Sequence, residues 1–295
     1  MMFDDFHDLK VKLIGDQYEV YGYRSGELHD ASSDRQVVEV VKYIKDNRAS
    51  GVHRFGDFRL RITKANEQNY SVRILPLEVK KFSELGIQSK YYENLLTDQY
   101  RKIGGLILLV GDTGAGKTTT YASLIIERLL RYGGYAHLLD ELIEYEVAGV
   151  YGKAPSQGYC EQIDVSEIEG GFEEAIHTAL RCFPSKTKSI LGIGEVRHAN
   201  VAGELLRVSI DGHLCIATMH AKSHQDACAR LVSLAKKSGE ADAAKLLASS
   251  LRFSLHQQFL ENKLITTGLP VYGRSEVIAK ITRELFADLM HHVIE

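Results

Sequence analysis

Several features of secreted, membrane-spanning and zinc-binding proteins are missing from this sequence. Its four cysteines show no C-x-x-C spacing, which argues against a structural zinc ribbon and favours reduced, buried thiols. No apolar run approaches the ~18–20 residues that span a bilayer. The acidic N-terminus lacks the apolar segment of a signal peptide. We therefore expect a cytoplasmic protein.

Neither sign of charge dominates the chain. It holds 36 Lys and Arg against 39 Asp and Glu, for a formal net charge of −3. A near-neutral chain lacks the basic footprint that binds nucleic-acid phosphates, so direct nucleic-acid binding is not expected. The length of 295 residues suits two domains or one large domain, and a hydrophobic content of 44% is typical of a globular protein.

One short segment indicates the chemistry of the chain. Residues 111–118 have the pattern G-x-x-x-x-G-K-T, which is that of a nucleotide-phosphate loop. An apolar run over 106–110 predicts a buried strand before it, and 119–130 show helical periodicity after it. Glycines let backbone N–H groups surround phosphate oxygens, and the helix N-terminus adds partial positive charge. We expect ATP to bind here.

Two side chains of this loop have distinct expected roles. Lys117 reaches the β- and γ-phosphates, and the hydroxyl of Thr118 holds Mg²⁺. The predicted nucleotide-binding residues are Gly111, Asp112, Thr113, Gly114, Ala115, Gly116, Lys117, Thr118 and Thr119.

ATP hydrolysis also needs a carboxylate that orients or deprotonates water. An apolar strand pattern ends at Glu195, which we assign as the catalytic base; a surface glutamate at a strand end is the alternative. The aspartate that usually assists Mg²⁺ would stand one position earlier, where this chain has Gly194. A second acidic strand end supplies Asp140, Glu141 and Glu144 as candidates to hold Mg²⁺ through water molecules, with a solvated acidic loop as the alternative.

Cationic groups for the transferring phosphoryl group are expected in two places. His220 ends a strand pattern and is placed to sense the γ-phosphate, whereas for His213, which precedes the same pattern, structural and functional roles stay open. Arg59, Arg61 and Arg73 alternate with apolar residues in a predicted hairpin and therefore share one face. That face is either a solvated sheet surface or a source of guanidinium groups for a phosphate of a neighbouring subunit.

Strand and helix patterns alternate through the C-terminal two thirds of the chain. Strands are predicted over 135–140, 189–194 and 214–219, and helices over 172–183, 199–210 and 223–237. Such alternation is typical of an α/β fold, with a mostly parallel sheet covered by helices on both faces and ligands at the carboxyl ends of the strands. Near the C-terminus we expect a hairpin formed by 255–266 and 271–279 and a closing helix from Thr282.

The first part of the chain has the pattern of a smaller α+β unit. Short alternating runs around Val11 and Val20 predict strands, and 58–63 with 70–74 predict a hairpin. Asp34 is placed to cap a helix. The predicted apolar side of that helix carries Val37, Val38, Val41, Tyr43 and Ile44. We place an N-terminal domain over 1–80, a linker and lead-in helix over 81–97, and the ATPase domain over 98–295.

Taken together, these segments resemble the type II/type IV secretion ATPases, a family that includes PilT-like pilus-retraction motors and their secretion and conjugation relatives. Residues 139–145 are similar to the family's acidic box, I-E-D-P-I-E-F, and 212–220 to its His box, G-H-L-V-x-x-T-L-H. A-L-R at 179–181 with G-E-V-R at 194–197 resembles the Walker B region. Q-Q-F-L at 257–260 resembles Q-Q-L-L, and the arginine-bearing hairpin with R-I-L-P resembles R-F-R-V-N … R-x-I-P.

The resemblance implies a PAS-like N-terminal domain, a RecA-like ATPase domain and a homo-hexameric ring. In such a ring Arg59, Arg61 and Arg73 would act as fingers across a subunit boundary. The motor would push on a platform protein at the cytoplasmic face of the inner membrane, in pilus retraction or assembly, secretion or conjugation. The family also has glycine before its Walker B glutamate, as at Gly194 here.

The chain departs from the family pattern at several positions. Asp140 and Glu141 stand in the reverse of the family's order, Leu142 replaces proline, and His198 replaces aspartate. These changes leave open which acidic-box carboxylate acts on Mg²⁺. Two other functions also remain open at this point. One is a RecA-like nucleic-acid motor, which the net charge of −3 disfavours, and the other is a slow ATP-gated assembly switch.

Overall fold

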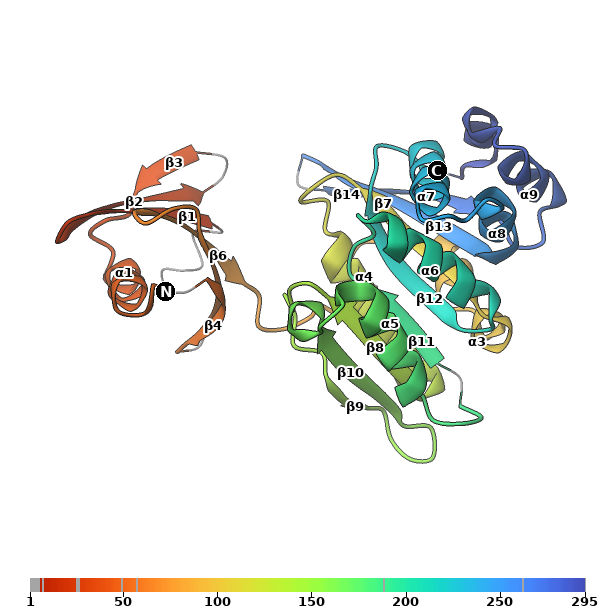
Figure 1. Ribbon diagram of the computed structural model, residues 1–295, viewed down its shortest axis with the longest axis horizontal. Coiled ribbons are helices and arrows are strands. Elements are labelled where there is room, and N and C mark those ends of the chain that lie inside the picture. Colours follow the sequence, from red (N-terminus) through yellow and green to blue (C-terminus); the bar gives the residue numbers. More distant parts are fainter. Residues whose placement is uncertain are drawn as a thin grey trace. The chain divides into compact units, whose positions relative to one another are not determined.

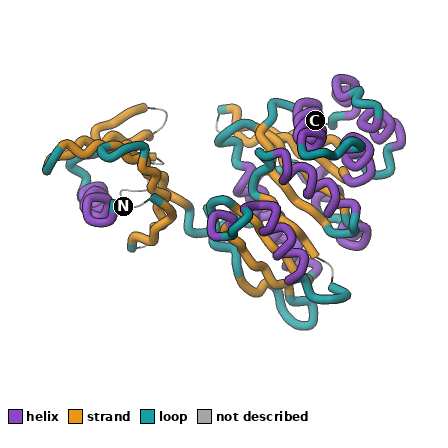
Figure 2. Tube along the Cα trace, in the orientation of Figure 1, coloured by secondary structure: helices purple, strands orange, loops and turns teal. Residues whose placement is uncertain are grey.

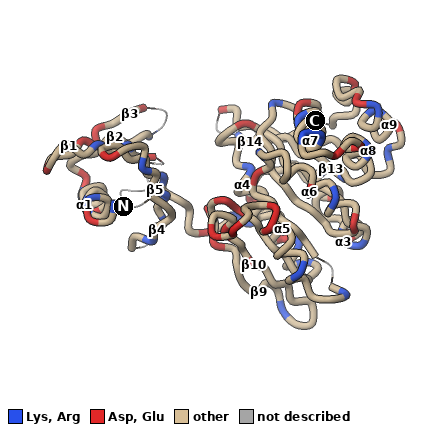
Figure 3. The backbone as a smooth tube through the Cα atoms, viewed as in Figure 1, with Lys and Arg blue, Asp and Glu red and all other residues tan. Residues whose placement is uncertain are grey.

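The structure is a computed structural model that describes residues 6, 8–24, 27–48, 50–56, 58–187, 189–261 and 263–294. The chain forms two compact units, both drawn in Figure 1. The first unit holds Met1–Glu78 together with the short segment Ile143–Glu146, and the second holds Val79–Leu142 and Val147–Glu295. The sequence pattern gives no sign that Ile143–Glu146 belongs to the first unit. Basic and acidic residues are interspersed over both units (Figure 3).

The described part of the first unit is built on a six-stranded antiparallel sheet with the order β3-β2-β1-β6-β5-β4. Its strands are β1 (Asp8–Ile14), β2 (Gln17–Arg24), β3 (Glu27–Asp30), β4 (Gly51–Phe55), β5 (Phe58–Lys64) and β6 (Asn69–Leu75). The predicted hairpin is confirmed, since β5 pairs with β6 and Ile62 lies opposite Val72. Helix α1 (Arg35–Asn47) covers one side of this sheet (Figure 2) and shares a buried core with it.

Helix α1 begins where the sequence predicts. The Asp34 carboxylate accepts hydrogen bonds from the backbone N–H groups of Gln36 (2.9 Å) and Val37 (3.3 Å), as an N-cap residue does. The prediction for Val38 is wrong, because its side chain is 39% exposed. The buried stripe runs through positions 37, 40, 41 and 44, and each helical residue turns the side chain by about 100°, which carries position 38 off the stripe.

The second unit is built on an eight-stranded mixed sheet, within the described residues, with the order β14-β13-β7-β12-β11-β8-β10-β9. Its strands are β7 (Gly105–Gly111), β8 (Gly134–Asp140), β9 (Gly149–Tyr151), β10 (Gly158–Asp164), β11 (Ser189–Ile193), β12 (Leu214–His220), β13 (Leu251–Leu260) and β14 (Lys263–Pro270). The six inner strands are parallel, and the edge strands β9 and β14 pair antiparallel with their neighbours. The prediction of a mostly parallel sheet is confirmed.

Helices cover both faces of this sheet. Their bounds are α2 (Tyr92–Leu95), α3 (Asp98–Ile103), α4 (Lys117–Tyr132), α5 (Gly171–Cys182), α6 (Ala199–Ile210), α7 (His224–Lys237), α8 (Ala243–Ser250) and α9 (Ser275–Thr282). Along β7, Leu106, Leu108 and Val110 share a core with α5 to α9. Ile107 and Leu109 point the other way, toward the face that α4 covers. None of the described helices is long and apolar enough to cross a membrane.

The segment predicted as a linker and lead-in helix is part of the second unit. Phe82, Tyr91 and Leu95 are buried there, in two 3₁₀ turns and the short helix α2. The hydroxyl of Tyr91 donates to the carbonyl oxygen of Thr266 at 3.0 Å, which ties this segment to β14. Apolar side chains therefore fix a stretch whose polar composition suggests a loose connection.

The predicted C-terminal hairpin is placed wrongly. The hairpin consists of β13 and β14, and the segment predicted as its second strand contains helix α9 instead. Gly268 lies inside β14, where a Cβ would meet Phe253 Cζ at 2.6 Å and Tyr91 Cε1 at 2.8 Å. Glycine at position 268 therefore allows close packing against Phe253 and Tyr91 and does not mark a turn. The closing helix is also misplaced, since α9 ends at Thr282 and a 3₁₀ helix, Phe286–His292, follows.

Candidate active site

The phosphate loop connects the last residue of β7 to the first residue of α4. Gly111 ends the strand, and a Cβ there would lie 2.2 Å from the carbonyl oxygen of Gln257 on the neighbouring strand β13. Gly114 and Gly116 have φ values of +78° and +79°, which side chains disfavour. Thr118 and Thr119 lie half-buried in the first turn of α4. The predicted strand–loop–helix context is present.

Lys117 points back over the loop that precedes it. Only 6% of this residue is exposed. Its Nζ donates hydrogen bonds to the carbonyl oxygens of Gly111 (2.9 Å) and Asp112 (2.8 Å), and it lies 3.1 Å from Nδ1 of His220. Burial lowers the pKa of this ammonium group from its ordinary value, and the negative charges of Glu195 and Asp112 partly oppose the change.

Three strands bring acid–base groups to the same edge of the sheet. Asp140 ends β8, Glu195 follows β11, and His220 ends β12, and these strands are adjacent and parallel. Nε2 of His220 lies 3.3 Å from Oε1 of Glu195, and Arg197 donates to the second oxygen of Glu195 at 2.6 Å. His220 therefore joins Lys117 to Glu195.

The hydrogen-bond partners of His220 select its tautomer. Because the ammonium group of Lys117 can only donate, Nδ1 of His220 accepts, and a neutral ring then carries its proton on Nε2. That N–H faces Glu195. Burial lowers the pKa of His220 below its ordinary value, and Lys117 lowers it further. The imidazole is therefore neutral near pH 7.

Glu195 is held in its ionised form. Burial alone raises the pKa of its carboxyl, but the hydrogen bond from Arg197 and the neighbouring cationic groups outweigh that effect, so the net pKa lies below the ordinary glutamate value. Its side chain remains 20% exposed. An ionised, partly accessible carboxylate next to a phosphate loop has the properties of a base for an attacking water molecule.

Asp140 occupies the space that a side chain at position 194 would need. A Cβ built on Gly194 would lie 2.0 Å from Oδ1 of Asp140. The backbone N–H of Gly194 also donates to the carbonyl oxygen of Leu139 at 3.0 Å, which holds the two strand ends together. The aspartate expected at position 194 is thus replaced in space by a carboxylate from the adjacent strand. The hydroxyl of Thr118 and this carboxylate are oxygen donors of the type that Mg²⁺ prefers.

The other two acidic-box residues have different surroundings. Glu141 lies 3.8 Å from Arg197 and 3.6 Å from His198, and it lines a pocket of about 520 Å³ next to the start of α5. Glu144 belongs to the first unit, where its Oε1 lies 3.9 Å from Arg61. Asp140 is therefore the acidic-box residue that contacts the glycine before Glu195.

The three arginines share one face, as their alternation predicts. Arg59 and Arg61 are two residues apart on β5, and Arg61 lies opposite Arg73 on β6. Arg73 pairs with Asp8 at 2.9 Å, and the side chains of Arg61 and Arg73 are 40% and 48% exposed.

Arg59 differs from the other two because it is only 5% exposed. It donates to the carbonyl oxygens of Ile143 and Glu144, both at 2.8 Å, and its Nε lies 3.1 Å from Oε1 of Glu146. These contacts hold the segment Ile143–Glu146 within the first unit. The guanidinium group of Arg59 therefore has partners on all of its nitrogen atoms.

One histidine and one glutamine have positions that the sequence analysis left open or did not consider. His213 lies at the opposite end of β12 from His220, about 20 Å away along the strand, where it contacts Ser189 and stacks on Phe183. These contacts place it away from the phosphate loop. Gln257, which sequence reasoning did not assign to the site, is fully buried and donates from Nε2 to the carbonyl oxygen of Ala115 at 2.6 Å. Strand β13 also carries Arg252, Ser254, His256 and Gln258, so no local sequence signal singles Gln257 out.

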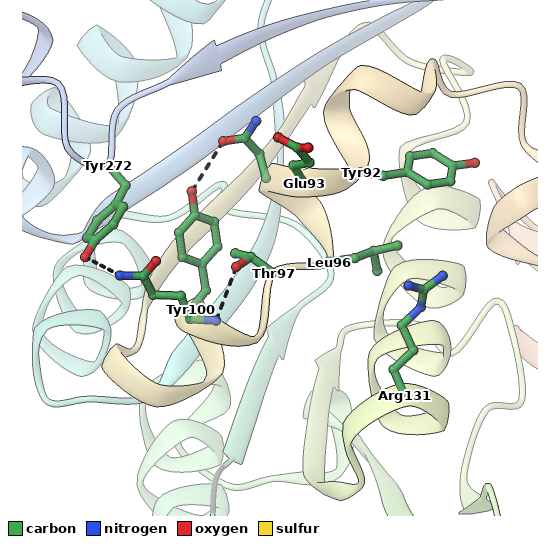
Figure 4. Close-up of a pocket in the computed structure, with 9 residues that line it drawn as sticks. Tyr92, Glu93, Leu96, Thr97, Tyr100, Arg131 and Tyr272 are labelled. Carbon is green, nitrogen blue, oxygen red and sulfur yellow. Dashed lines mark hydrogen bonds between the residues drawn. The ribbon is translucent and has the colours of Figure 1, made fainter.

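A separate pocket of about 640 Å³ lies at the other end of α4 (Figure 4). It is lined in part by Tyr92, Tyr100, Arg131 and Tyr272, and Gln99 donates to the hydroxyl of Tyr272 at 2.7 Å. Arg131 belongs to the last turn of this 16-residue helix, whereas the phosphate loop precedes its first turn. The pocket is therefore about 20 Å from the loop along the helix axis and is not the phosphate site.

Comparison with known proteins finds a matching family model and relatives with pilus and secretion functions. The family model described as type II/IV secretion system protein matches residues 54–266. The type IV pilus retraction ATPase PilT of Pseudomonas aeruginosa is 26% identical over 235 residues, which are 79% of this chain and 64% of that protein. The type II secretion system protein HxcR of the same species is 32% identical over 167 residues, 56% of this chain and 31% of that protein. The chain thus spans less than two thirds of these relatives.

Solved structures share the fold. The crystal structure of the pilus retraction motor PilT with bound ADP matches with a TM-score of 0.71 at 21% identity, over 97% of this chain and 84% of that chain. The ATPase DotB of Legionella pneumophila matches with a TM-score of 0.67 at 16% identity, over 99% and 85% of the two chains.

Proposed function

The chain belongs to the type II/IV secretion system protein family, and from this premise we propose that it is an ATP-hydrolysing motor subunit of a pilus or secretion machine. One observation carries the proposal. At the phosphate loop, Lys117, His220 and Glu195 form a continuous chain of contacts, and the carboxylate of Asp140 takes the place of a side chain at position 194. A phosphate cradle, a base and an additional carboxylate are the parts that ATP hydrolysis needs.

In the proposed reaction a water oxygen attacks the γ-phosphorus, the bond to the β–γ bridging oxygen breaks, and ADP and inorganic phosphate are released. Glu195 accepts the proton of the attacking water. Lys117 binds the β- and γ-phosphates. His220 contacts both residues, so a γ-phosphate that draws Lys117 away changes the hydrogen bonds of the imidazole that holds Glu195.

The metal assignment follows from oxygen ligands at the carboxyl ends of the parallel strands and at the start of α4. The Thr118 hydroxyl and the Asp140 carboxylate would hold Mg²⁺, and Glu141, which pairs with Arg197 and His198, would have a supporting role. Mg²⁺, when bound, neutralises negative charge on the β- and γ-phosphates.

The assembly part of the proposal is a homo-hexamer. In it Arg61 and Arg73, whose side chains are about half exposed, would reach the nucleotide of a neighbouring subunit. Arg59 would instead hold Ile143–Glu146, since its guanidinium group is already engaged. The first unit would be the PAS-like domain and the second the RecA-like ATPase domain. The motor would work on a platform protein at the cytoplasmic face of the inner membrane. Similarity to the pilus retraction ATPase PilT and to the type II secretion system protein HxcR supports a role in a pilus or secretion machine.

Substitution of the proposed base tests the function. We expect Glu195→Gln to bind ATP with Mg²⁺ and to lose turnover by roughly 10²–10⁴-fold, the usual contribution of a general base. Phosphate release and nucleotide binding measure the two effects. Glu240→Gln is the matched control, because Glu240 is a partly buried glutamate that pairs with Arg207 outside the site, and its turnover should stay within a few-fold of wild type. Lys117→Ala should abolish ATP binding. Wild-type turnover of Glu195→Gln would show that this residue is not the base.

A further inference from the structure

An exposed aromatic side chain lies directly beside the phosphate loop. Phe259 is near the end of β13 and is 54% exposed, although aromatic side chains of this size are usually buried. The outer edge of its ring faces Gly116, since a Cβ built on this glycine would lie 3.3 Å from Cε2 and 3.7 Å from Cζ of Phe259. The ring therefore lies at the N-terminus of α4 and remains open to solvent.

The direction of a bound nucleotide follows from the strand order. Strands β12 and β13 flank β7 on opposite sides. The groups that act on the γ-phosphate, His220 and Glu195, are on the β12 side, where His220 contacts Lys117. A triphosphate whose terminal phosphate lies there extends along the loop, so its nucleoside end lies on the β13 side. This is the side that carries Phe259.

The strand that carries Phe259 is fixed to the loop. Gln257 is two residues earlier on β13, on the same face, and donates to the carbonyl oxygen of Ala115. Its own carbonyl oxygen approaches Gly111 so closely that a Cβ would lie 2.2 Å away. The ring of Phe259 is consequently held at a defined position relative to the phosphate-binding backbone.

We propose that Phe259 is the platform on which the base of the bound nucleotide stacks. This inference rests on the proposed nucleotide-binding function and adds the subsite for the base. Stacking on an aromatic side chain is worth about 1–3 kcal/mol per base and tolerates different bases, because every base has a π-face. Phe259 thus contributes to the affinity for nucleoside triphosphates in general, and the phosphate loop supplies the binding of the triphosphate.

A tryptophan probe tests the subsite directly. The sequence has no tryptophan, so Phe259→Trp introduces a single fluorophore at the proposed platform. We expect ATP and ADP with Mg²⁺ to quench its fluorescence and inorganic tripolyphosphate to leave it nearly unchanged. Leu260→Trp is the matched control, because Leu260 is 62% exposed on the opposite face of the same strand. Equal responses of the two variants, or no response of Phe259→Trp at saturating ATP, would overturn the proposal.

An affinity comparison separates the subsite from the phosphate loop. Phe259→Ala should weaken ATP binding by roughly 5- to 150-fold and leave tripolyphosphate binding unchanged, whereas Leu260→Ala should change neither. If the wild-type protein binds neither ligand, nucleotide binding itself is wrong, and the platform with it. If the wild type binds both and Phe259→Ala loses affinity for neither, or for both equally, only the platform is wrong. Far-ultraviolet circular dichroism checks that each variant is folded.

Discussion

Replacement of Gly194 by alanine tests the strand-end geometry most directly. The φ of Gly194 lies outside the left-handed region, so alanine is allowed by the backbone, and the conflict is with the neighbouring carboxylate. The new Cβ would lie 2.0 Å from Oδ1 and 3.1 Å from Cγ of Asp140, whereas ordinary contact begins at 3.4 Å. The Asp140 oxygen therefore has to move by about 1.4 Å.

The displacement affects turnover more than binding. A shift of about 1 Å in a group that positions the reaction costs on the order of 10²-fold in rate. Gly194 and Asp140 are only partly buried and the displaced atom ends a side chain, so overpacking should lower the free energy of unfolding by about 1 kcal/mol, the low end of the usual range. We expect Gly194→Ala to retain ATP affinity, because the phosphate loop is untouched. Phosphate release at saturating ATP with Mg²⁺ and urea unfolding followed by circular dichroism measure the two effects.

A double-mutant cycle isolates the cause. In an Asp140→Ala background no carboxylate remains to be displaced, so Gly194→Ala should add little to either effect. The exchange of Gly194→Asp with Asp140→Gly returns a carboxylate to the usual position and should recover part of the activity. The reasoning is refuted if Gly194→Ala has wild-type turnover, or if it lowers turnover equally with and without the Asp140 side chain.

Three further predictions concern ionisable side chains other than Asp140. Arg59→Ala should lower the stability of the first unit by about 1–3 kcal/mol, because two carbonyl groups lose their donor; an unchanged thermal melt would contradict the contacts assigned to this residue. Arg61→Ala should lower turnover without weakening ATP binding, and mixing it with Lys117→Ala should restore part of the activity if the arginine acts across a subunit boundary; the absence of any recovery would argue for action within one subunit. Burial lowers the pKa of His224 to about 3, below the ~6.5 of an unfolded histidine. Between these two pH values the unfolded state therefore binds more protons than the folded state. Stability should then fall as the pH drops from about 6.5 toward 3, by up to ~1.4 kcal/mol per pH unit; urea unfolding across this range should show a flatter dependence for His224→Gln, and equal slopes would contradict the assignment.

Local patterns were sufficient for the elements that depend on local physics. The apolar strand before Gly111, the glycine-bearing loop and the helix from Lys117 are contiguous in sequence, and their order alone indicates a phosphate loop. Glu195 and His220 were also identifiable, because each is a single polar group at the end of an apolar strand, and parallel strands bring such ends to one edge. The C-terminal hairpin failed because Gly268 is required for packing against Tyr91, which no local pattern reveals.

Local sequence patterns could not predict contacts between segments that are far apart in the chain. The sequence left open which acidic-box carboxylate acts on Mg²⁺, and the approach of Asp140 to Gly194 depends on the pairing of β8 with β11. The burial of Arg59 depends on Ile143–Glu146, which lie more than 80 positions away along the chain. Gln257 meets Ala115 across 142 positions, so its part in the loop is visible only once β13 pairs with β7.

By itself, the amino-acid sequence determined the chemical parts of this protein: a phosphate loop, a strand-end glutamate and a strand-end histidine, each encoded within a few consecutive residues. Tertiary structure decided which of those parts meet, because strand order and register set distances between residues that the chain separates by tens of positions. It placed one carboxylate over a glycine, buried one arginine of three, and set an exposed aromatic ring beside the loop.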